Sequence, residues 1–292
     1  MIDTPVGQPM REKVCLVTGA TRGIGLVTAC ELARLGASVI GVGRSDETCE
    51  AATRQVREQT GSASVRYLAA DLSSQAEIRR LAAEVLESTP RLDVLVNNAG
   101  AIYLTRQQSV DGFELTFAVN HLAYFLLTNL LLDRLRASAP ARIVSVASAA
   151  HQGTSLDLED LDATSGRYSG WRAYQQSKLA NILFTRELAR RLEGSGVTAN
   201  ALHPGYVKTQ IFRVEGVAGW MLRRAADLFA ISPEKGARTS IFLATSPEVD
   251  GVSGQYFVRC RAVPGSPQSR DPTAAQKFWQ ASEQFTGLAL QA

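Results

Sequence analysis

Tyr174 and Lys178 are the two residues whose types and spacing are best suited to proton transfer. They stand four positions apart in a stretch whose pattern predicts a helix, so both side chains lie on one face. A tyrosine near its ordinary pKa is a poor base at neutral pH, and a nearby ammonium favours the phenolate. The pair therefore indicates a general acid/base, Tyr174, whose pKa Lys178 brings closer to the working pH.

Ser148 follows a strand of small and apolar residues, predicted over 142–147. Its hydroxyl can hold a substrate oxygen and stabilise developing negative charge. Ser145, in the same strand, is a competing candidate. His151 is a candidate substrate contact, but a serine–histidine nucleophile is disfavoured, because the sequence shows no glycine-flanked nucleophile elbow and no obvious acidic partner.

A glycine-rich turn separates the first predicted strand (13–18) from the first predicted helix (23–35). Such a turn lets the backbone approach a pyrophosphate, and the helix N-terminus adds free N–H groups and the positive end of its dipole. The alternative is a tight turn that binds nothing. The context favours dinucleotide binding, and the residues assigned to the cofactor here are Gly19, Thr21, Arg22, Gly23, Ile24 and Gly25.

The end of the second predicted strand (38–42) indicates which nucleotide is bound. A carboxylate at this point would bind the ribose hydroxyls of NAD and repel a 2′-phosphate. The sequence has Gly43-Arg44-Ser45 instead, and an arginine can pair with a dianionic phosphate. Arg22 can add a second cation, although either arginine could be a solvated loop charge. Asp46 is expected to cap the following helix. We therefore predict NADP(H).

Short apolar runs alternate with helical patterns along the chain, which predicts a parallel sheet covered by helices on both faces. One domain spans 1–292, because the length suits one large α/β core. Seven strands are expected, at 13–18, 38–42, 65–70, 92–97, 142–147, 197–203 and 255–258. Helices are expected at 23–35, 75–87, 112–135, 170–192, 233–244 and 273–285, and another follows the second strand and ends at about residue 59.

Composition excludes several other classes of protein. The net charge of +3 is too small and too dispersed to indicate a nucleic-acid partner. No apolar run reaches the length of a membrane span, and residues 1–12 do not resemble a signal peptide. The four cysteines show no paired spacing, so we expect no disulfide framework, no metal, and the cytosol as location. His121 and His203 are interpreted as packing or loop residues.

The ordered set of motifs resembles the short-chain dehydrogenase/reductase family over about Lys13 to Val258. The glycine turn has the spacing T-G-x-x-x-G-x-G, and the other landmarks follow in order. These are Asp71-Leu72, Asn97-Asn98-Ala99-Gly100, Asn120, Ser148, Tyr174 with Lys178, and Pro204-Gly205-x-Val207-x-Thr209. Each motif alone is weak, whereas the ordered set is specific.

The resemblance implies a single-domain Rossmann fold and roles for individual residues. Asp71 would bond the adenine, Lys178 would hold the nicotinamide ribose, and Asn120 would hold a water for proton relay. The cofactor supplies the hydride, and the protein supplies position and the proton. Further cofactor contacts implied are Leu72, Asn98, Ala99, Gly100, Tyr174, Pro204, Gly205, Val207 and Thr209.

Residues 117–128 and 177–184, and the tail 254–257 with Asp271 and Trp279, look like the retinol dehydrogenase-like branch. That branch acts on retinoids and other lipophilic aldehydes, ketones and alcohols, usually with NADP(H). Its animal members often carry a membrane-anchoring N-terminus, which residues 1–12 do not show. The resemblance therefore implies a lipophilic carbonyl or alcohol substrate, with peripheral membrane contact as an open alternative.

Residues 205–232 correspond to the family's substrate lid, and residues 261–292 form a C-terminal extension. The lid carries apolar residues and arginines, so it is expected to cover a lipophilic substrate. Packing as core, pairing with another subunit and contact with a membrane surface compete with that interpretation. Phe212 in the lid, and Ile102 and Tyr103 after the Asn-Asn-Ala-Gly turn, are pocket candidates.

Two rival functions remain. The first is an NADP(H)-binding redox sensor without catalysis, which is disfavoured because Ser148, Tyr174, Lys178 and Asn120 are all present. The second is a nucleotide-sugar epimerase or dehydratase, which is disfavoured because only a short tail follows the last strand. The sequence does not choose among oligomeric states, and homo-oligomers are common in the family.

Overall fold

The computed structural model describes residues 8–156, 167–206, 212–213 and 231–288, the side chains of 212–213 excepted. Its main sheet has the strand order β10-β9-β7-β6-β4-β1-β2-β3, in which all neighbours are parallel except β9 and β10. The bounds are β1 Val14–Thr18, β2 Ser38–Gly43, β3 Val65–Ala69, β4 Val94–Asn97, β6 Ala141–Val146, β7 Val197–His203, β9 Tyr256–Val258 and β10 Arg261–Val263. The predicted fold class is confirmed, and β10 adds an antiparallel edge strand to the seven expected.

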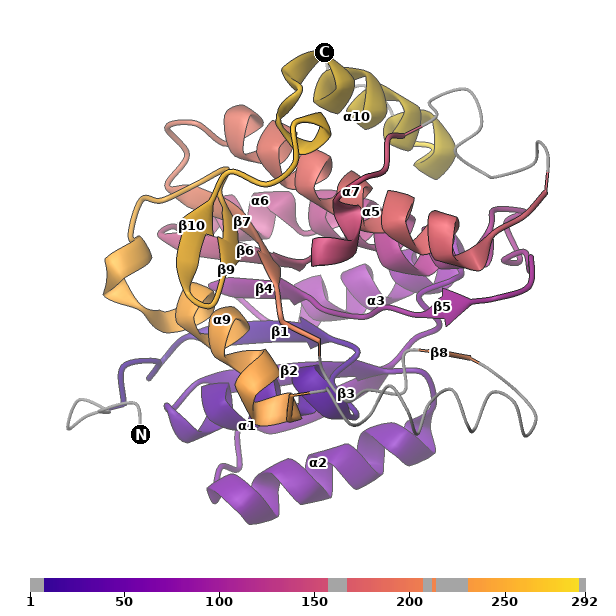
Figure 1. Cartoon of the computed structure of the whole chain (residues 1–292). Coiled ribbons are helices and arrows are strands. Elements are labelled where there is room, and N and C mark those ends of the chain that lie inside the picture. Colours follow the sequence, from indigo (N-terminus) through magenta and orange to yellow (C-terminus); the bar gives the residue numbers. More distant parts are fainter. Residues whose placement is uncertain (1–7, 157–166, 207–211, 214–230, 289–292) are drawn as a thin grey trace.

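Helices cover both faces of this sheet (Figure 1). One layer holds α1 (Gly23–Arg34), α2 (Asp46–Thr60) and α9 (Pro233–Thr245). The opposite layer holds α3 (Gln75–Ser88), α5 (Ala123–Leu130), α6 (Leu132–Ala137) and α7 (Gly170–Arg191), with α10 (Pro272–Thr286) packed over α7. Because the chain passes from one layer to the other after β3, strands β2 and β4 lie on opposite sides of β1. Open α/β sheets bind ligands at such a switch point.

Alternation along β1 explains why the core divides into two clusters. Leu16 packs with the layer of α3, α5 and α7, whereas Cys15 and Val17 pack with the layer of α1 and α9. Successive side chains of a strand point to opposite faces, so a strand buried on both faces must be apolar throughout. All five residues of β1 are accordingly buried.

Serine side chains begin several of the helices. Ser45, Ser74, Ser169 and Ser232 each accept a hydrogen bond from a backbone N–H in the first turn of α2, α3, α7 and α9. The expectation that Asp46 caps α2 was therefore wrong by one position. Asp46 lies in the first turn, where its negative charge still favours the helix dipole.

The long helix expected over 112–135 is divided into shorter pieces. The buried carboxylate of Glu114 accepts hydrogen bonds from the N–H groups of Thr116 and Phe117, and it starts the short helix α4 (Leu115–Phe117). A π-helical turn, η1 (Ala118–Leu122), follows before α5 begins. Apolar periodicity could not show this irregular turn, because residues 120–128 are all buried and offer no single apolar face whose shift would reveal the extra residue.

The last helix, α10, packs over the layer of α5 and α7. Trp279 of α10 lies 4.8 Å from Phe125 and 5.8 Å from Phe184, measured between ring centroids. A short turn η4 (Gln268–Arg270) leads into α10, whose first N–H groups bond the carboxylate of Asp271. Among the described residues, no helix is both long and apolar enough to cross a membrane.

All three histidines of the chain have a lowered pKa because burial disfavours the imidazolium. The pKa falls from 6.5 to about 3 for His121 and to about 4 for His203, and it also falls for His151. Below pH 6.5 the unfolded chain therefore binds histidine protons that the folded chain excludes. Stability decreases as the pH falls through this range.

We expect the free energy of unfolding to decrease between pH 6.5 and pH 5. The slope approaches about 1.4 kcal/mol per pH unit for each histidine that stays neutral in the folded chain. Chemical denaturation at several pH values measures this slope. His121→Gln removes one titrating group, so the slope should fall by the contribution of one histidine, about 1.4 kcal/mol per pH unit. Equal slopes in both proteins would contradict the expectation.

Candidate active site

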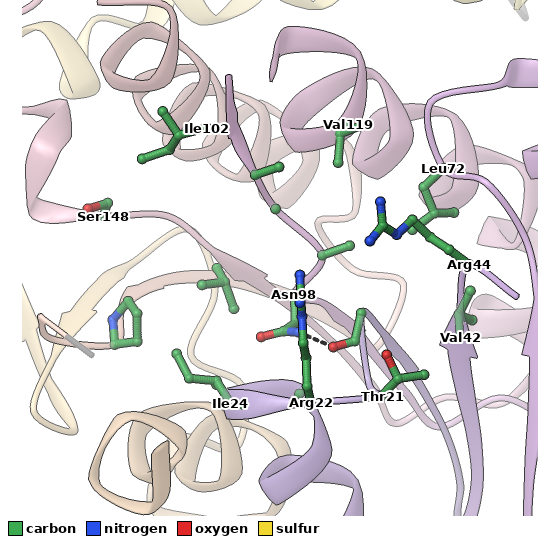
Figure 2. Close-up of a pocket in the computed structure, with 18 of the residues that line it drawn as sticks. Thr21, Arg22, Ile24, Val42, Arg44, Leu72, Asn98, Ile102, Val119 and Ser148 are labelled. Atoms are coloured by element: carbon green, nitrogen blue, oxygen red, sulfur yellow. Dashed lines mark hydrogen bonds between the residues drawn. The ribbon is translucent and has the colours of Figure 1, made fainter. Parts of the chain in front are cut away.

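A cavity of about 950 Å³ lies at the carboxyl ends of β1, β2, β4, β6 and β7. Its volume suits a dinucleotide together with part of a substrate. Figure 2 shows Val42, Leu72 and Arg44 at one end of this cavity and Ser148 at the other, with Asn98 between them. The two labelled ends therefore differ, one carrying the Arg44 guanidinium and the other the Ser148 hydroxyl.

The glycine turn fits tightly against the end of β4. Asn98 donates from Nδ2 to the carbonyl oxygens of Thr18 at 2.8 Å and Gly19 at 3.2 Å. The hydroxyl of Thr18 accepts from the N–H groups of Asn98 and Ala99. A Cβ atom on Gly25 would collide with the Gly19 carbonyl and lie 2.5 Å from Asn98 Nδ2. This packing exposes the backbone of the turn to a ligand and holds it rigid.

The end of the cavity that carries Arg44 is formed by the ends of β2 and β3. Arg44 is exposed there, beside Ser45, Asp71 and Leu72 in the cavity wall. Asp71 accepts hydrogen bonds from the N–H and hydroxyl of Ser73, so its carboxylate is held in place. Among the described residues lining this end, Arg44 and Arg22 are positively charged. A phosphate group is the complementary ligand for such a pair.

Lys178 occupies the opposite end, together with Tyr174 and Ser148. Lys178 is 2% exposed, and its Nζ donates to the Val146 carbonyl oxygen at 2.9 Å. The ammonium lies 5.7 Å from the ring centroid of Tyr174 and 5.8 Å from that of Tyr124. A Cβ on Gly100 would lie 3.3 Å from Asn120 Oδ1 and 3.5 Å from Nζ, so the segment after β4 lies directly beside the ammonium.

The pKa values of Tyr174 and Lys178 differ from the sequence-based expectation. Burial raises the pKa of Tyr174 to about 12, although a hydrogen bond to Ser148 acts in the opposite direction. Burial also lowers the pKa of Lys178 to about 7. The expectation that Lys178 brings the tyrosine pKa down was wrong for the protein alone, because removal of the phenolate from water has the larger effect.

Ser148, not Ser145, faces the cavity. Ser148 lies just after β6, and its Oγ accepts a hydrogen bond from the N–H of Ala150 at the start of the short turn η2 (Ala149–His151). Ser145 is fully buried inside β6, and its hydroxyl has no hydrogen-bond partner among the residues that the structure describes. The residue that leaves the strand is thus the one that can reach a substrate.

Asn120 lies in the π-helical turn behind the cavity wall and is fully buried. Its side chain accepts from the Ala101 N–H at 2.8 Å and donates to the Ala101 carbonyl and the Ser177 hydroxyl. Its backbone carbonyl accepts from Nδ2 of Asn181 at 3.0 Å. These bonds join the segment after β4 to α7, so Asn120 fixes the wall on which Lys178 lies.

His151 is placed away from the cavity, contrary to the expectation that it contacts substrate. It is fully buried, and it is absent from the cavity lining. Its Nδ1 lies 2.6 Å from the Ser148 carbonyl oxygen, and its Nε2 lies 3.1 Å from the N–H of Ser266. Both ring nitrogens are therefore engaged with backbone, because the turn η2 directs the ring inward.

Most of the other expected site residues line the cavity. They are Gly19, Thr21, Arg22, Gly23, Ile24, Gly25, Arg44, Asp71, Leu72, Asn98, Ala99, Gly100, Tyr103, Pro204 and Gly205. Val207 and Thr209 lie outside the described residues. Phe212 is described by its backbone alone, in the short strand β8 (Phe212–Arg213), which pairs with β5 (Ile102–Tyr103). That pairing places β8 next to Tyr103.

Several lining residues were not expected from the sequence. Trp171 is 48% exposed at the cavity and lies 5.7 Å from Tyr174 between ring centroids. Its position three residues before Tyr174 on one helix was the available signal. Other additions include Leu115, Val119 and Tyr206, whereas Ile102, like Tyr103, was expected from its place after the Asn-Asn-Ala-Gly turn. The additions come from separate elements, which is why no single motif indicated them.

Residues 13–216 match the family model described as short chain dehydrogenase. This chain belongs to the short-chain dehydrogenase family. It is 44% identical over 281 residues to Retinol dehydrogenase 13 of Homo sapiens, covering 94% of this chain and 85% of the relative. It is 45% identical over 294 residues to Retinol dehydrogenase 14 of Mus musculus, covering 96% and 87%.

Solved structures of short-chain dehydrogenases share the fold. An uncharacterized protein from Mycobacterium paratuberculosis has a TM-score of 0.78 and 36% identity, covering 97% of this chain and 98% of that one. A short chain dehydrogenase from Burkholderia cenocepacia in complex with NADP has a TM-score of 0.68 and 28% identity, covering 85% and 96%. The resemblance inferred from the motifs, including its retinol dehydrogenase-like branch, is thereby confirmed. The chain is an oxidoreductase of this family and acts on a small molecule.

Gly25→Ala tests the close packing of the glycine turn. The added Cβ must displace the Gly19 carbonyl and the Asn98 amide, so we expect nicotinamide dinucleotide binding to weaken at least about 10-fold. Fluorescence titration with NADPH measures this affinity. Gly112→Ala is the control, because Gly112 has φ +88° but open space around it. It should lose stability through backbone strain alone and bind as the wild type does.

Proposed function

We propose that this protein is an NADP(H)-dependent oxidoreductase that interconverts a carbonyl compound and an alcohol, with Tyr174 as the general acid/base. The observation that carries the proposal is the grouping of Ser148, Tyr174 and Lys178 at one end of a dinucleotide-sized cavity. The Ser148 side chain lies close enough to act on the pKa of Tyr174, and the Lys178 ammonium lies 5.7 Å from the tyrosine ring centroid. Three groups that can hold one oxygen atom thus converge.

Each of these residues has a distinct part in the reaction. The nicotinamide, when bound, supplies or accepts the hydride. The Ser148 hydroxyl binds the substrate oxygen and stabilises the negative charge that develops on it. Tyr174 then donates its phenolic proton to that oxygen in reduction and takes it back in oxidation. Lys178 places a cation beside both, and Val146 fixes its position.

The protonation state of Tyr174 at neutral pH is the one with which carbonyl reduction begins. With a pKa of about 12, the tyrosine keeps its proton at neutral pH. A protonated phenol is the form that a carbonyl reduction consumes. As negative charge builds on the substrate oxygen, proton transfer from Tyr174 becomes favourable, because the oxygen of an alkoxide is the stronger base.

The choice of NADP(H) rests on Arg44 at the nucleotide end. The end of β2 carries this exposed arginine where a carboxylate would bind the ribose hydroxyls of NAD. A guanidinium can hold a 2′-phosphate by two parallel hydrogen bonds. The Burkholderia cenocepacia relative in complex with NADP supports the same choice.

The substrate we propose is a lipophilic aldehyde, ketone or alcohol. The wall next to Ser148 carries Ile102, Tyr103, Leu115, Trp171 and Tyr206. Apolar and aromatic walls with few polar groups are typical of sites for such molecules. The retinol dehydrogenases among the relatives support this class by name. The ends of the lid are joined by a bond from the Ile231 N–H to the Tyr206 carbonyl.

The location of the protein in the cytosol stays a prediction.

Tyr174→Phe should lower kcat for NADPH-dependent carbonyl reduction by about 10²- to 10⁴-fold, the usual contribution of a general acid. NADPH consumption against aldehydes and ketones graded in lipophilicity measures this. NADPH affinity should stay within a few fold, because the ring remains. If the folded wild type binds NADPH and reduces no compound of the panel, the redox-sensor function replaces the enzyme function.

Arg44→Ala should weaken NADPH binding by about 10- to 100-fold and leave NADH binding nearly unchanged, since one charge-assisted contact is removed. The ratio of kcat/KM with the two cofactors measures the preference. Arg54→Ala removes an exposed arginine from α2 and serves as the matched control. An equal loss for NADPH and NADH would show that Arg44 does not read the 2′-phosphate.

A further inference from the structure

Two buried histidines connect the catalytic centre to the C-terminal segment, which we define as residues 264–286. His151 lies between Ser148 and Ser266, which are 118 positions apart in the chain. His121 lies between Asn181 of α7 and Ser282 of α10. Residues 264–286 follow the region 13–216 matched by the family model. Both bridges therefore reach residues beyond the region that this family model matches.

The partners of His151 determine its protonation state. Nε2 accepts the Ser266 N–H, so the ring proton must be on Nδ1 and is donated to the Ser148 carbonyl at 2.6 Å. A cationic ring would lose the acceptor that Ser266 needs. Burial and the nearby charge of Arg186 both hold the pKa of His151 below its ordinary value. A neutral imidazole thus joins the catalytic serine to the C-terminal segment.

His121 has the same polarity at the second bridge. Asn181 donates from Nδ2 to the Asn120 carbonyl at 3.0 Å, so its Oδ1 is the acceptor for His121 Nδ1–H at 3.3 Å. Nε2 then accepts from the Ser282 hydroxyl at 3.0 Å. The Ser282 hydroxyl also lies 2.9 Å from the Phe278 carbonyl oxygen. A hydroxyl has one proton to donate, and because Nε2 carries no proton in this tautomer, the Ser282 proton points to Nε2. Nδ1 again points to the catalytic side.

The second bridge ends beside Lys178. Nδ2 of Asn181 lies 3.4 Å from the Val146 carbonyl oxygen, which accepts from Lys178 Nζ at 2.9 Å. The same amide holds the Asn120 carbonyl in the π-helical turn. The chain Ser282–His121–Asn181 therefore fixes the carbonyl that positions the ammonium. The chain Ser266–His151 fixes the backbone that presents the Ser148 hydroxyl.

We propose that His121 and His151 are positioning residues that make the C-terminal segment part of the catalytic scaffold, each through a neutral imidazole held at both nitrogens. The inference rests on the proposed oxidoreductase function. A displacement of about 1 Å at reacting groups can reduce turnover by two orders of magnitude. Bridges at both Ser148 and Lys178 prevent such displacements, although neither histidine touches the cavity.

His151→Asn tests the first bridge. The asparagine amide can still reach the Ser148 carbonyl, but it is too short to accept from Ser266. We expect kcat to fall at least about 10-fold while KM for NADPH changes less than about 2-fold. Hydrogen exchange of the peptides covering 146–152 should become faster. A kcat equal to that of the wild type, with unchanged exchange, would overturn the proposal for this bridge.

Ser282→Ala tests the second bridge from its far end, without touching the active site. We expect a fall in kcat of at least about 5-fold and faster exchange in peptides covering 118–122. Thr286→Val is the matched control, since Thr286 is buried one turn further along α10 and its hydroxyl donates to carbonyls of its own helix. It should lose similar thermal stability and keep kcat. Equal losses of kcat in Ser282→Ala and Thr286→Val would show that the loss comes from lower stability, and this would overturn the proposal for the second bridge.

The exchange measurement also separates this inference from the proposed function. If the wild type turns over no substrate, the proposed function fails, and the bridges are judged by exchange alone. The bridges are then supported if peptides covering 146–152 exchange faster in His151→Asn and do not exchange faster in Thr286→Val. If exchange in His151→Asn equals that of the wild type, the bridges are overturned. If the wild type is active and both bridge variants keep their kcat and exchange, the bridges fail and the function stands.

Discussion

The close approach of β1 and β4 at their carboxyl ends is the constraint on which the rest of the structure depends. Thr18 and Asn98 bond each other's backbone there, and Gly25 leaves no room for a side chain. The sheet reverses its strand order at this point, so the crevice above it is open to a ligand. A backbone that no side chain covers can present its N–H groups to a pyrophosphate.

Burial governs the chemistry at the other end of the cavity. The ammonium of Lys178 is almost completely removed from water, with a carbonyl as its hydrogen-bond partner, and its pKa falls to about 7. The phenol of Tyr174 keeps its proton for the same reason. Tyr174 therefore keeps its proton at neutral pH, whereas Lys178 lies near the midpoint of its titration, so small changes in local charge can move a proton.

The irregular elements, rather than the regular ones, shape the active site. The π-helical turn directs Asn120 toward the segment after β4, and the turn η2 directs His151 away from the cavity. Trp171 reaches the cavity because it lies one helical turn before Tyr174. These placements depend on local backbone geometry, which apolar periodicity does not encode, and this explains why the helix expected over 112–135 is divided by a π-helical turn.

The sequence by itself determined the order of strands and helices, the glycine turn, and the grouping of Ser148, Tyr174 and Lys178. Apolar runs, turn residues and ordered motifs carry that information locally. The tertiary structure alone decided the protonation states and the partners of His121 and His151, since burial and contacts between distant segments set them. It also decided that the C-terminal segment packs on α7, because that contact joins helices far apart in the chain.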